Sequence, residues 1–550
     1  MPRFARIALI ATSVTALMLA AAQAAEVKPL LPPSELHKPL GTDWLSYSGD
    51  YTGQRFSRLT QVDRNTVKHL SLAWVIRPNA STTSAIVGGE GKGDFPVAPA
   101  QMKGSVLEVD GVLYVTSPDH VWAIDGRDGR ELWHYYWKTR GSTHIANRGA
   151  AIWNNSLLFE TPDNYLVSLD VRTGKENWHV EIADFDQQYF STMAPIVIGD
   201  QVMVGTGNDL DAPGFLQSYD PRTGKRNWIH YTVPMKAGDP GLETWPSLDA
   251  ARHGGGQVWL PGSYDPETDL YIFGTGNPTP GYTGAGRKGD NLFTCTLMAV
   301  KVSTGKMVWY YQTSPHDTHD WDSAQTPILF DGTIDGKPRK LVSTAARNGF
   351  FFTLDRLTGE HIVTKQFGTT ANWSTGLRKT GQPEPDPLKS AQIPGALVSP
   401  MEAGVVNWPP AAFNPDLGLF YANESNSFNL LYLTDPDPRG SMGLAGKRVG
   451  MLGTVSNALQ AIDYRTGKYV WRREWPQGAG IGSGMLTTTT GLLFTSDGSG
   501  NFVALDAKNG DLLWHTRIGN LSNAPQTFEI DGRQYVLAGV GDTLYSFVLY

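Results

Sequence analysis

Segments of one pattern recur along the chain and decide its fold. VWAIDGRDGRELW (121–133), LVSLDVRTGKENW (166–178) and LQAIDYRTGKYVW (459–471) each place an alternating apolar strand before Asp, a Gly-containing turn and a Trp. Further copies stand at 216–228, 297–309, 351–363 and 502–514. Alternation buries one face of a strand, Gly supplies the positive φ of a tight turn, and the Trp can lie flat between neighbouring sheets. The copy at 297–309 has Lys301 for Asp, and 351–363 lacks the Trp.

The repeats predict an all-β protein. A unit of roughly 45 residues that holds four strands is typical of a propeller blade. Seven units are visible, and 70–76 can pair with 544–550 to close an eighth blade and remove the open sheet edges. We therefore predict an eight-bladed β-propeller with tryptophan-docking motifs. Seven blades and an array of β-sandwiches remain alternatives.

Composition excludes several classes of protein. The 550 residues are 40% hydrophobic and 18% charged, which supports a buried core and excludes a wholly disordered chain. Net charge is −7 with no basic tract, which argues against nucleic-acid binding. The single Cys excludes an intrachain disulfide, a thiolate zinc site and a CxxCH haem attachment.

The N-terminus has the pattern of an export signal. Arg3 and Arg6 precede the apolar run 7–22, and Ala22-Gln23-Ala24 has the small residues of a cleavage site. The alternative is a membrane anchor, but the run is shorter than the roughly 20 residues of a spanning helix. We expect a signal peptide at 1–24, a single mature domain at 25–550, no membrane span, and a periplasmic protein if the source is Gram-negative.

Less repetitive segments carry a family resemblance. They are Tyr47–Ser57, Asn147-Arg-Gly149, Trp259, Gly274–Pro278, Pro315–Asp322, Arg347–Phe350 and Asn407-Trp408. Together with the repeats, and in this order, they make nearly all of the mature chain similar to quinoprotein alcohol dehydrogenases, which use pyrroloquinoline quinone (PQQ). The resemblance implies a PQQ-binding propeller that oxidises a small-molecule alcohol.

The resemblance also implies a metal site. Asn277 and Asp320 match metal-site positions of the family, and Asp320 matches its proposed base. Asp209 falls where the family usually has Glu, and Asp211 is the alternative if the loop aligns differently. Such oxygen donors suit Ca²⁺ rather than zinc or copper.

Asp322 favours a lanthanide over calcium. In the family, a second Asp two positions after the catalytic one resembles the mark of lanthanide-using members. Residues two apart in an extended segment face the same way, so Asp320 and Asp322 are expected to reach one ion. A third carboxylate favours a trivalent ion. The alternative is that Asp322 caps a turn or forms a surface pair.

PQQ is a planar tricarboxylate that needs cations and a flat apolar floor. By resemblance, Arg148 and Arg347 provide the guanidinium groups, Trp259 the floor on which the ring stacks, and Thr161 and Asn407 polar contacts. For Trp259 the alternative is blade packing, and for the two Arg residues it is a surface salt bridge.

The sequence departs from the family pattern at several positions. Lys103 stands near a family Glu and is expected to pair with a PQQ carboxylate. His144 lies near the position of a vicinal disulfide, which one Cys forbids, and is our candidate for its replacement. Gln257 replaces a Thr, and the Gly-rich stretch 478–484 lacks a Trp that narrows the pocket of methanol-type enzymes. We therefore expect a substrate bulkier than methanol, with a secondary alcohol as one option.

The resulting functional hypothesis is a periplasmic PQQ-dependent alcohol dehydrogenase. Electrons are expected to leave through a separate cytochrome c, and a homodimer is one option for assembly. A sugar or polyol quinoprotein dehydrogenase and a non-catalytic propeller scaffold are the competing hypotheses.

Overall fold

The structure is a computed structural model, and only part of the chain is described by it. The described residues are 28–78, 101–142, 144, 146–323, 325–433, 447–476 and 482–550. The expected signal peptide at 1–24 lies outside them, as do four residues of the stretch 478–484. Among the described residues, no helix is long and apolar enough to cross a membrane.

Strands form almost all of the regular structure, which confirms the all-β class. Eight sheets have four or five strands each within the described residues. The first sheet in chain order consists of β3 (Leu107–Val109), β4 (Val112–Ser117), β5 (His120–Asp125) and β6 (Glu131–Tyr136), and the second of β7 (Ala151–Trp153), β8 (Ser156–Glu160), β9 (Tyr165–Asp170) and β10 (Glu176–Glu181). The third consists of β11 (Ile196–Ile198), β12 (Gln201–Gly205), β13 (Phe215–Tyr219) and β14 (Arg226–Tyr231). The fourth consists of β15 (Ser263–Asp265), β16 (Leu270–Gly274), β17 (Thr296–Lys301) and β18 (Met307–Gln312).

The remaining four sheets complete the series. They are β19 (Ile328–Ile334), β20 (Lys337–Ala345), β21 (Phe350–Asp355) and β22 (His361–Gln366); β25 (Ala396–Val398), β26 (Ala412–Asn414), β27 (Leu419–Leu433), β28 (Lys447–Asp463) and β29 (Tyr469–Glu474); β1 (Phe56–Ser57), β30 (Leu486–Thr488), β31 (Leu492–Ser496), β32 (Asn501–Asp506) and β33 (Leu512–Arg517); and β2 (Leu70–Ile76), β34 (Gln526–Ile530), β35 (Arg533–Val540) and β36 (Thr543–Leu549).

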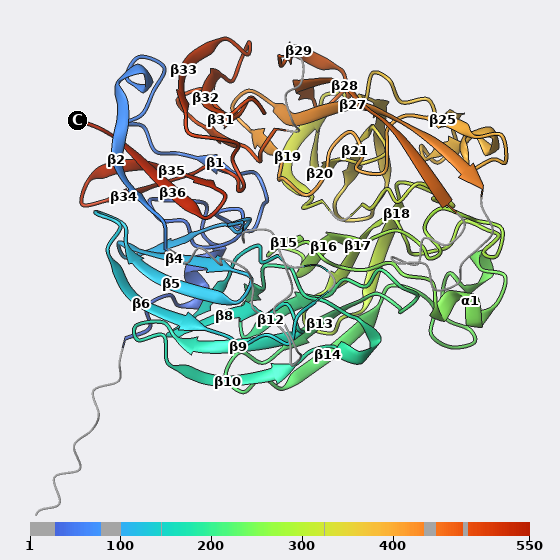
Figure 1. The fold of residues 1–550 in the computed structure, drawn as a ribbon, viewed down its shortest axis with the longest axis horizontal. Coiled ribbons are helices and arrows are strands. Elements are labelled where there is room, and N and C mark those ends of the chain that lie inside the picture. Colours follow the sequence, from blue (N-terminus) through green and yellow to red (C-terminus); the bar gives the residue numbers. More distant parts are fainter. Residues whose placement is uncertain are drawn as a thin grey trace, which may run out of the picture.

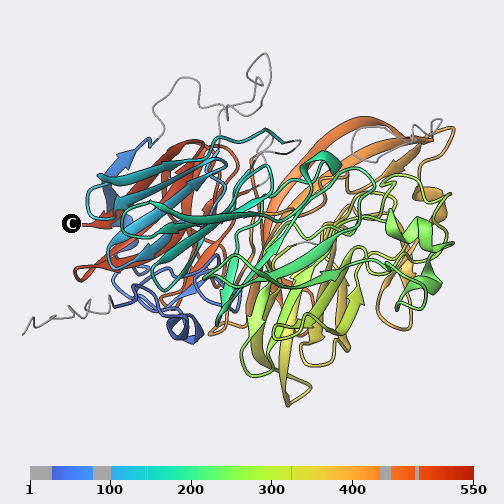
Figure 2. The same ribbon diagram turned by 90° about the horizontal axis from the view of Figure 1, so that it is seen from below.

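Short elements lie between the sheets. β23 (Ser374–Leu377) and β24 (Pro383–Pro385) form a separate two-stranded sheet. The helical turns are η1 (Pro33–His37), η2 (Val67–His69), η3 (Phe185–Gln187), η4 (Leu242–Thr244), η5 (Pro387–Lys389) and the α-helix α1 (Leu248–Arg252). The hairpin of β27 and β28 is much longer than the others and is the orange ribbon on the right of Figure 2.

The two ends of the described chain meet in one sheet. β2 pairs antiparallel with β36, with Leu70 opposite Leu549 and Ile76 opposite Leu544, as the sequence predicts. In Figure 1 the colours accordingly run round the molecule until the red C-terminal strands lie beside the blue N-terminal ones. The strand order β2-β36-β35-β34 removes an edge that would otherwise be open.

Neighbouring sheets are joined by contacts between a Trp and a turn glycine. A Cβ built on Gly174 would lie 2.5 Å from Cε3 of Trp133, so only glycine leaves room for the ring. The indole N–H of Trp133 donates to the carbonyl of Val171 in the same turn at 3.1 Å. The same close approach occurs for Trp74 on Gly129, Trp178 on Gly224, Trp228 on Gly305, Trp309 on Gly359 and Trp471 on Gly510.

Two junctions use other side chains. Where the repeat at 351–363 lacks its Trp, Val363 and Lys365 cover Gly467 instead. The last junction brings Trp514 edge-to-face against Phe547, with ring centroids 5.6 Å apart. Each sheet is thus packed on the next in chain order, and the final contact leads back to the sheet that contains β2.

Arg55 ties the N-terminal segment to the sheets formed by the end of the chain. Its side chain is fully buried and donates to the carbonyls of Met485 at 2.7 Å, Tyr47 at 3.0 Å and Pro525 at 2.8 Å. The guanidinium also lies 4.9 Å from the ring centroid of Trp44. Burial lowers the Arg55 pKa to about 10.

Arg55→Met should destabilise the fold. The substitution leaves three buried carbonyls without a partner, for which we expect a loss of about 3–5 kcal/mol in the free energy of unfolding. Denaturant unfolding measures it. Arg58→Met is the matched control, because Arg58 is exposed, and it should change stability by less than about 0.5 kcal/mol. Equal losses in both variants would contradict a central role for Arg55.

Candidate functional site

A cavity of about 300 Å³ brings together most of the residues that the sequence singled out. Its wall is built from loops that follow strands of several sheets. The lining residues predicted from the sequence are Lys103, His144, Arg148, Asp209, Trp259, Asn277, Asp320, Asp322, Arg347 and Asn407. This volume lies at the lower end of the range for small-molecule sites.

The loop after β18 is organised by one buried carboxylate. Asp317 Oδ2 accepts backbone N–H groups from His319 at 3.3 Å, Asp320 at 2.9 Å and Trp321 at 3.2 Å. Trp321 is buried, stacks on His319 with centroids 4.1 Å apart, and donates to the Met401 carbonyl. These contacts fix the backbone immediately around Asp320.

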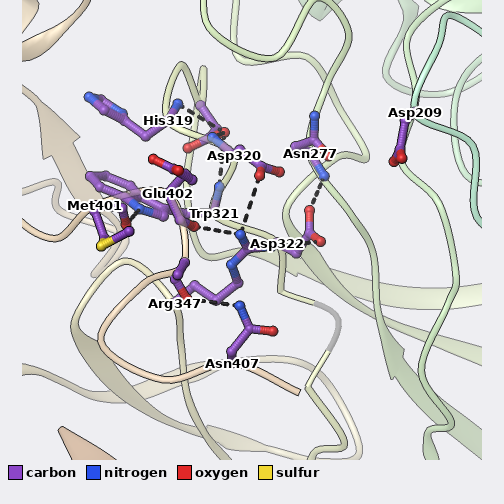
Figure 3. A network of polar contacts seen from close by, with 12 residues as sticks. Asp209, Asn277, His319, Asp320, Trp321, Asp322, Arg347, Met401, Glu402 and Asn407 are labelled. Atoms are coloured by element: carbon purple, nitrogen blue, oxygen red, sulfur yellow. Dashed lines mark hydrogen bonds and ion pairs between the residues drawn. The ribbon is translucent and has the colours of Figure 1, made fainter. Parts of the chain in front are cut away.

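Asp320 has a positive φ of 68°, so the segment is not extended. We predicted that Asp320 and Asp322 face the same way because the chain is extended there, and this premise is wrong. Their carboxylates nevertheless converge on one group. Arg347, in the turn between β20 and β21, donates to Asp322 Oδ2 at 2.9 Å and to Asp320 Oδ2 at 3.3 Å (Figure 3).

Asp322 is held from both sides. Its Oδ1 accepts the backbone N–H of Asn277 at 2.5 Å, and its Oδ2 also accepts the indole N–H of Trp259 at 2.9 Å. The residue is only 6% exposed and its partners are distant in sequence, so it does not form a surface pair. Asp322 therefore links the loop of Asn277 to the Trp259 indole in the cavity wall.

Burial dominates the electrostatics of this group. It raises the pKa of Asp320 well above its usual value and that of Asp322 less strongly, and Arg347 opposes both shifts. Burial acts to lower the pKa of Arg347, but the two carboxylates outweigh it and raise that pKa. The guanidinium consequently stays charged and compensates the carboxylates.

A stack of cations and indoles forms another part of the wall. The Arg148 guanidinium lies 4.7 Å from the ring centroid of Trp259 and 5.3 Å from that of Trp408. It donates to the Thr192 carbonyl at 3.0 Å, and burial lowers its pKa to about 10. Lys103 lies 5.9 Å from the Trp408 centroid. Such contacts place positive charge beside flat aromatic surfaces.

His144 and Asp209 pair with each other. His144 Nε2 lies 2.5 Å from Asp209 Oδ2, and the His144 ring packs on Phe190 at 4.9 Å. The hydrogen bond to Asp209 raises the pKa of His144. In Figure 3 Asp209 stands apart from Asp320 and Asp322. Among the described residues, no three His, Cys, Asp or Glu side chains lie close enough together to hold a metal ion.

Some predicted residues have other partners. Thr161 is buried outside the cavity wall, where its hydroxyl donates to Asp163 at 2.7 Å. Asp211, the alternative to Asp209, is exposed and lies 3.3 Å from His253. Asn407 lines the cavity, but its amide donates to the Ala403 carbonyl and accepts the N–H of Trp408.

Several wall residues were not singled out as site residues from the sequence. They are Ala146, Phe190, Thr192, Gly207, Asn208, Gly276 and Trp408. Phe190 and Thr192 belong to an irregular connection with no motif, so no signal pointed to them. Trp408 follows Asn407 in one of the matching segments, and its aromatic character was the available signal.

The wall contains polar atoms that lack protein partners. Arg148 Nε, Arg347 Nε, Gln257 Oε1 and Thr192 Oγ1 are buried and form no hydrogen bond. Buried polar groups are normally satisfied, so these atoms leave hydrogen-bonding capacity for water or a polar ligand. Guanidinium groups and a flat indole fit a planar tricarboxylate such as PQQ. The oxygens of Asn277, Asp320 and Asp322 fit a hard metal ion.

Comparisons with known proteins agree with a site for PQQ and a metal ion. A family profile described as the β-propeller domain of glucose/ethanol/alcohol dehydrogenases, labelled PQQ, matches residues 44–367, which is more than half of the chain. The chain belongs to the PQQ-dependent alcohol dehydrogenase family. It is accordingly an oxidoreductase. A second profile, outer membrane protein assembly factor BamB, matches residues 455–547.

Similar proteins of this family cover most of the chain. Quinoprotein alcohol dehydrogenase PedH of Pseudomonas putida is 33% identical, over 88% of this chain and 83% of its own. Quinoprotein ethanol dehydrogenase of Pseudomonas putida is 32% identical, over 95% and 90%. A europium-containing methanol dehydrogenase structure has a TM-score of 0.82 at 28% identity, over 94% of this chain and 99% of its own. The sheets described above therefore match those of PQQ-dependent propeller enzymes.

Asp317→Ala should lower turnover because Asp317 holds the backbone of Asp320 in place. Removing the carboxylate leaves three backbone N–H groups without their acceptor, so we expect kcat with PQQ and metal to fall at least about 10-fold and stability to fall by about 1–3 kcal/mol. Asp317→Asn retains an acceptor oxygen and should recover part of both. Steady-state dye reduction and thermal unfolding measure the effects.

Asp290→Ala is the matched control for this loop. Its carboxylate pairs with Arg378 at 2.7 Å at a partly exposed position, so its loss should cost less than about 1 kcal/mol and leave kcat unchanged. Wild-type kcat in Asp317→Ala would show that the loop does not depend on this carboxylate.

Proposed function

We propose that this chain is a periplasmic dehydrogenase that oxidises an alcohol bulkier than methanol, primary or secondary, to an aldehyde or ketone. The observation that carries the proposal is the Arg347 bridge, which holds Asp320 and Asp322 in the wall shared with Trp259 and Arg148. When bound, PQQ would supply the hydride acceptor, and a metal held by Asn277, Asp320 and Asp322 would act as a Lewis acid on it. Asp320 takes the proton from the substrate hydroxyl.

Burial prepares Asp320 for that role. A carboxylate with an ordinary pKa is a weak base, and burial raises the pKa of Asp320 against the opposing effect of Arg347. Asp317 holds its backbone by accepting the Asp320 N–H at 2.9 Å. The carboxylate is thus fixed in the cavity wall before a substrate enters.

The proposed cofactor contacts use the aromatic and cationic wall. Trp259 provides the floor, Arg148 and Lys103 provide charge for the quinone carboxylates, and Asn407 provides a polar contact. His144 covers part of the cavity where relatives have a disulfide. Thr161 is proposed as a polar contact on the family resemblance alone, since its hydroxyl donates to Asp163 and it does not line the cavity.

The proposed metal ligands are Asn277, Asp320 and Asp322. A trivalent lanthanide is favoured because Asp322 adds a further carboxylate beside Asp320, and the added negative charge stabilises a trivalent ion. Ca²⁺ is the alternative. Asp209 joins the ligand set only if its pair with His144 opens, because the two atoms lie 2.5 Å apart.

The fold proposal is a single eight-bladed propeller over 25–550. Each of the eight sheets serves as one blade, and the Trp–Gly contacts serve as docking motifs between blades. A signal peptide at 1–24, periplasmic location, a separate cytochrome c as electron acceptor and the option of a homodimer complete the proposal. A non-catalytic scaffold has no need for buried, unpartnered Arg and Gln atoms around a cavity.

Metal-free protein given PQQ should oxidise alcohols when a hard metal is added. We expect reduction of an artificial dye with La³⁺, with butan-1-ol or butan-2-ol preferred over methanol. Parallel assays with Ca²⁺ in place of La³⁺ show which of the two ions supports activity. Neither quinone binding nor dye reduction with any alcohol would refute the proposed function, whereas activity with Ca²⁺ alone would refute only the lanthanide assignment.

Asp322→Ala should remove lanthanide binding. Binding of Eu³⁺ is followed by its luminescence, which reports bound metal without turnover. We expect an affinity loss of at least about 10-fold, because one of the proposed carboxylate ligands disappears. Asp211→Ala, at an exposed position outside the cavity, is the matched control and should bind Eu³⁺ as wild type does. Unchanged Eu³⁺ binding in Asp322→Ala would make Asp322 a support for Arg347 and Trp259 only.

A further inference from the structure

A second cavity of about 350 Å³ adjoins the first. The two cavities share Asn407 and Trp408 as lining residues, so they lie side by side at this point of the wall. The rest of its wall comes from four parts of the chain. They are Gln101, Pro409, Gly482–Gly484 and Leu521–Asn523.

The second cavity differs from the first in charge. Among the described residues, its lining has no charged side chain. The first cavity, by contrast, is lined by Lys103, Arg148, Arg347, Asp209, Asp320 and Asp322. An ionic group placed in the second cavity would lose water without gaining a counter-charge. The described lining therefore suits an uncharged occupant better than an ionic one.

The polar lining consists of amides and hydroxyls. Gln101, Ser483, Ser522 and Asn523 supply these groups, and Trp408 supplies an aromatic face. The Ser483 and Ser522 hydroxyls already donate to the carbonyls of Gly484 and Met102, so they are left as acceptors for the hydroxyl groups of a ligand. Hydroxyls and amides both donate and accept hydrogen bonds. A carbon skeleton that carries several hydroxyl groups matches this combination, because its hydroxyls meet the polar groups and its C–H surface meets the indole.

The wall is held in place by bonds to its own backbone. Asn523 accepts the N–H of Gly539 at 2.8 Å and donates to the Gly104 carbonyl, and Ser522 donates to the Met102 carbonyl at 2.9 Å. Gly482 and Gly484 form another part of the wall, where the backbone packs closely on its neighbours. A Cβ on Gly484 would lie 2.5 Å from the Ala524 Cβ, so this backbone approaches its neighbour closely. The cavity is therefore part of the packed structure.

We propose that the second cavity binds the part of the substrate remote from the reacting hydroxyl, and that this part is an uncharged polyhydroxylated chain. This inference rests on the proposed function, since it places the reacting carbon beside Asp320 in the first cavity. It specifies a polyol as the substrate class, in preference to a bulky apolar alcohol or to a charged sugar derivative.

The test compares substrates of equal carbon number on the full mature protein with PQQ and its activating metal. Ribitol should have a kcat/KM at least about 10-fold above that of pentan-1-ol, because a site with hydrogen-bonding groups discriminates against an analogue without hydroxyls. Ribonate, which carries a carboxylate, should be a poorer substrate than ribitol. A preference for pentan-1-ol or for ribonate would overturn the proposal.

The double variant Gln101→Leu/Ser483→Ala tests the lining itself. It should lower kcat/KM for ribitol about 10-fold while leaving that for pentan-1-ol within about 2-fold. Ser71→Ala, at an exposed position on β2, is the control. An equal fall with both substrates would overturn the assignment of the second cavity.

A separate measurement distinguishes failure of the substrate class from failure of the proposed function. Quenching of tryptophan fluorescence by added PQQ reports quinone binding without turnover. Quinone binding with oxidation of alkanols but not of ribitol would overturn the polyol assignment and leave the dehydrogenase intact. No quinone binding and no oxidation of any alcohol would overturn both.

Discussion

Every sheet of this protein has an apolar face that must be buried on the sheet beside it, and this constraint governs the structure. A Trp from one sheet and a turn glycine from the next meet too closely for any side chain other than hydrogen, as Trp133 and Gly174 show. The series of packed sheets is complete only when strands from the two ends of the chain pair in one sheet. Pairing of β2 with β36 and the buried Arg55 accomplish that step.

Closure also explains the position of the site. Connections between strands converge on one cavity, and they come from sheets distant in sequence. Asn277, Asp322 and Arg347 lie in three different connections but share one network of hydrogen bonds. The surrounding sheets hold these loops, so carboxylates that would otherwise repel each other are kept beside a single guanidinium. Buried, mutually perturbed charges of this kind are characteristic of functional sites.

Much of this arrangement could be predicted from residues alone. The strand–Asp–Gly–Trp repeats specify sheets and turns because alternation and tight turns are local properties. The one repeat without a Trp, at 351–363, is also the one whose contact with the next sheet uses Val363 and Lys365. Most site residues were also recognisable, because Asp320, Arg347 and Trp259 stand in segments that resemble a known family.

Partner choice could not be predicted in the same way. Arg347 and Arg148 stay predicted quinone contacts, but the sequence did not indicate that Arg347 binds Asp320 and Asp322 or that Arg148 lies near two indoles. Asp209 stays a predicted metal ligand, and its pair with His144 was likewise not foreseen. Such pairings depend on distances between loops of different sheets, which no local pattern encodes.

The amino-acid sequence by itself determined the all-β class and the pairing of the chain ends, because periodicity and turn chemistry are properties of short segments. Resemblance to a known family added a set of candidate site residues, most of which line one cavity. Only the tertiary structure decided which carboxylates share Arg347, that Asp320 has a positive φ, and that an uncharged second cavity opens beside Trp408. Each of those depends on burial and on contacts between residues far apart in the chain, where packing chooses among partners that are chemically equivalent.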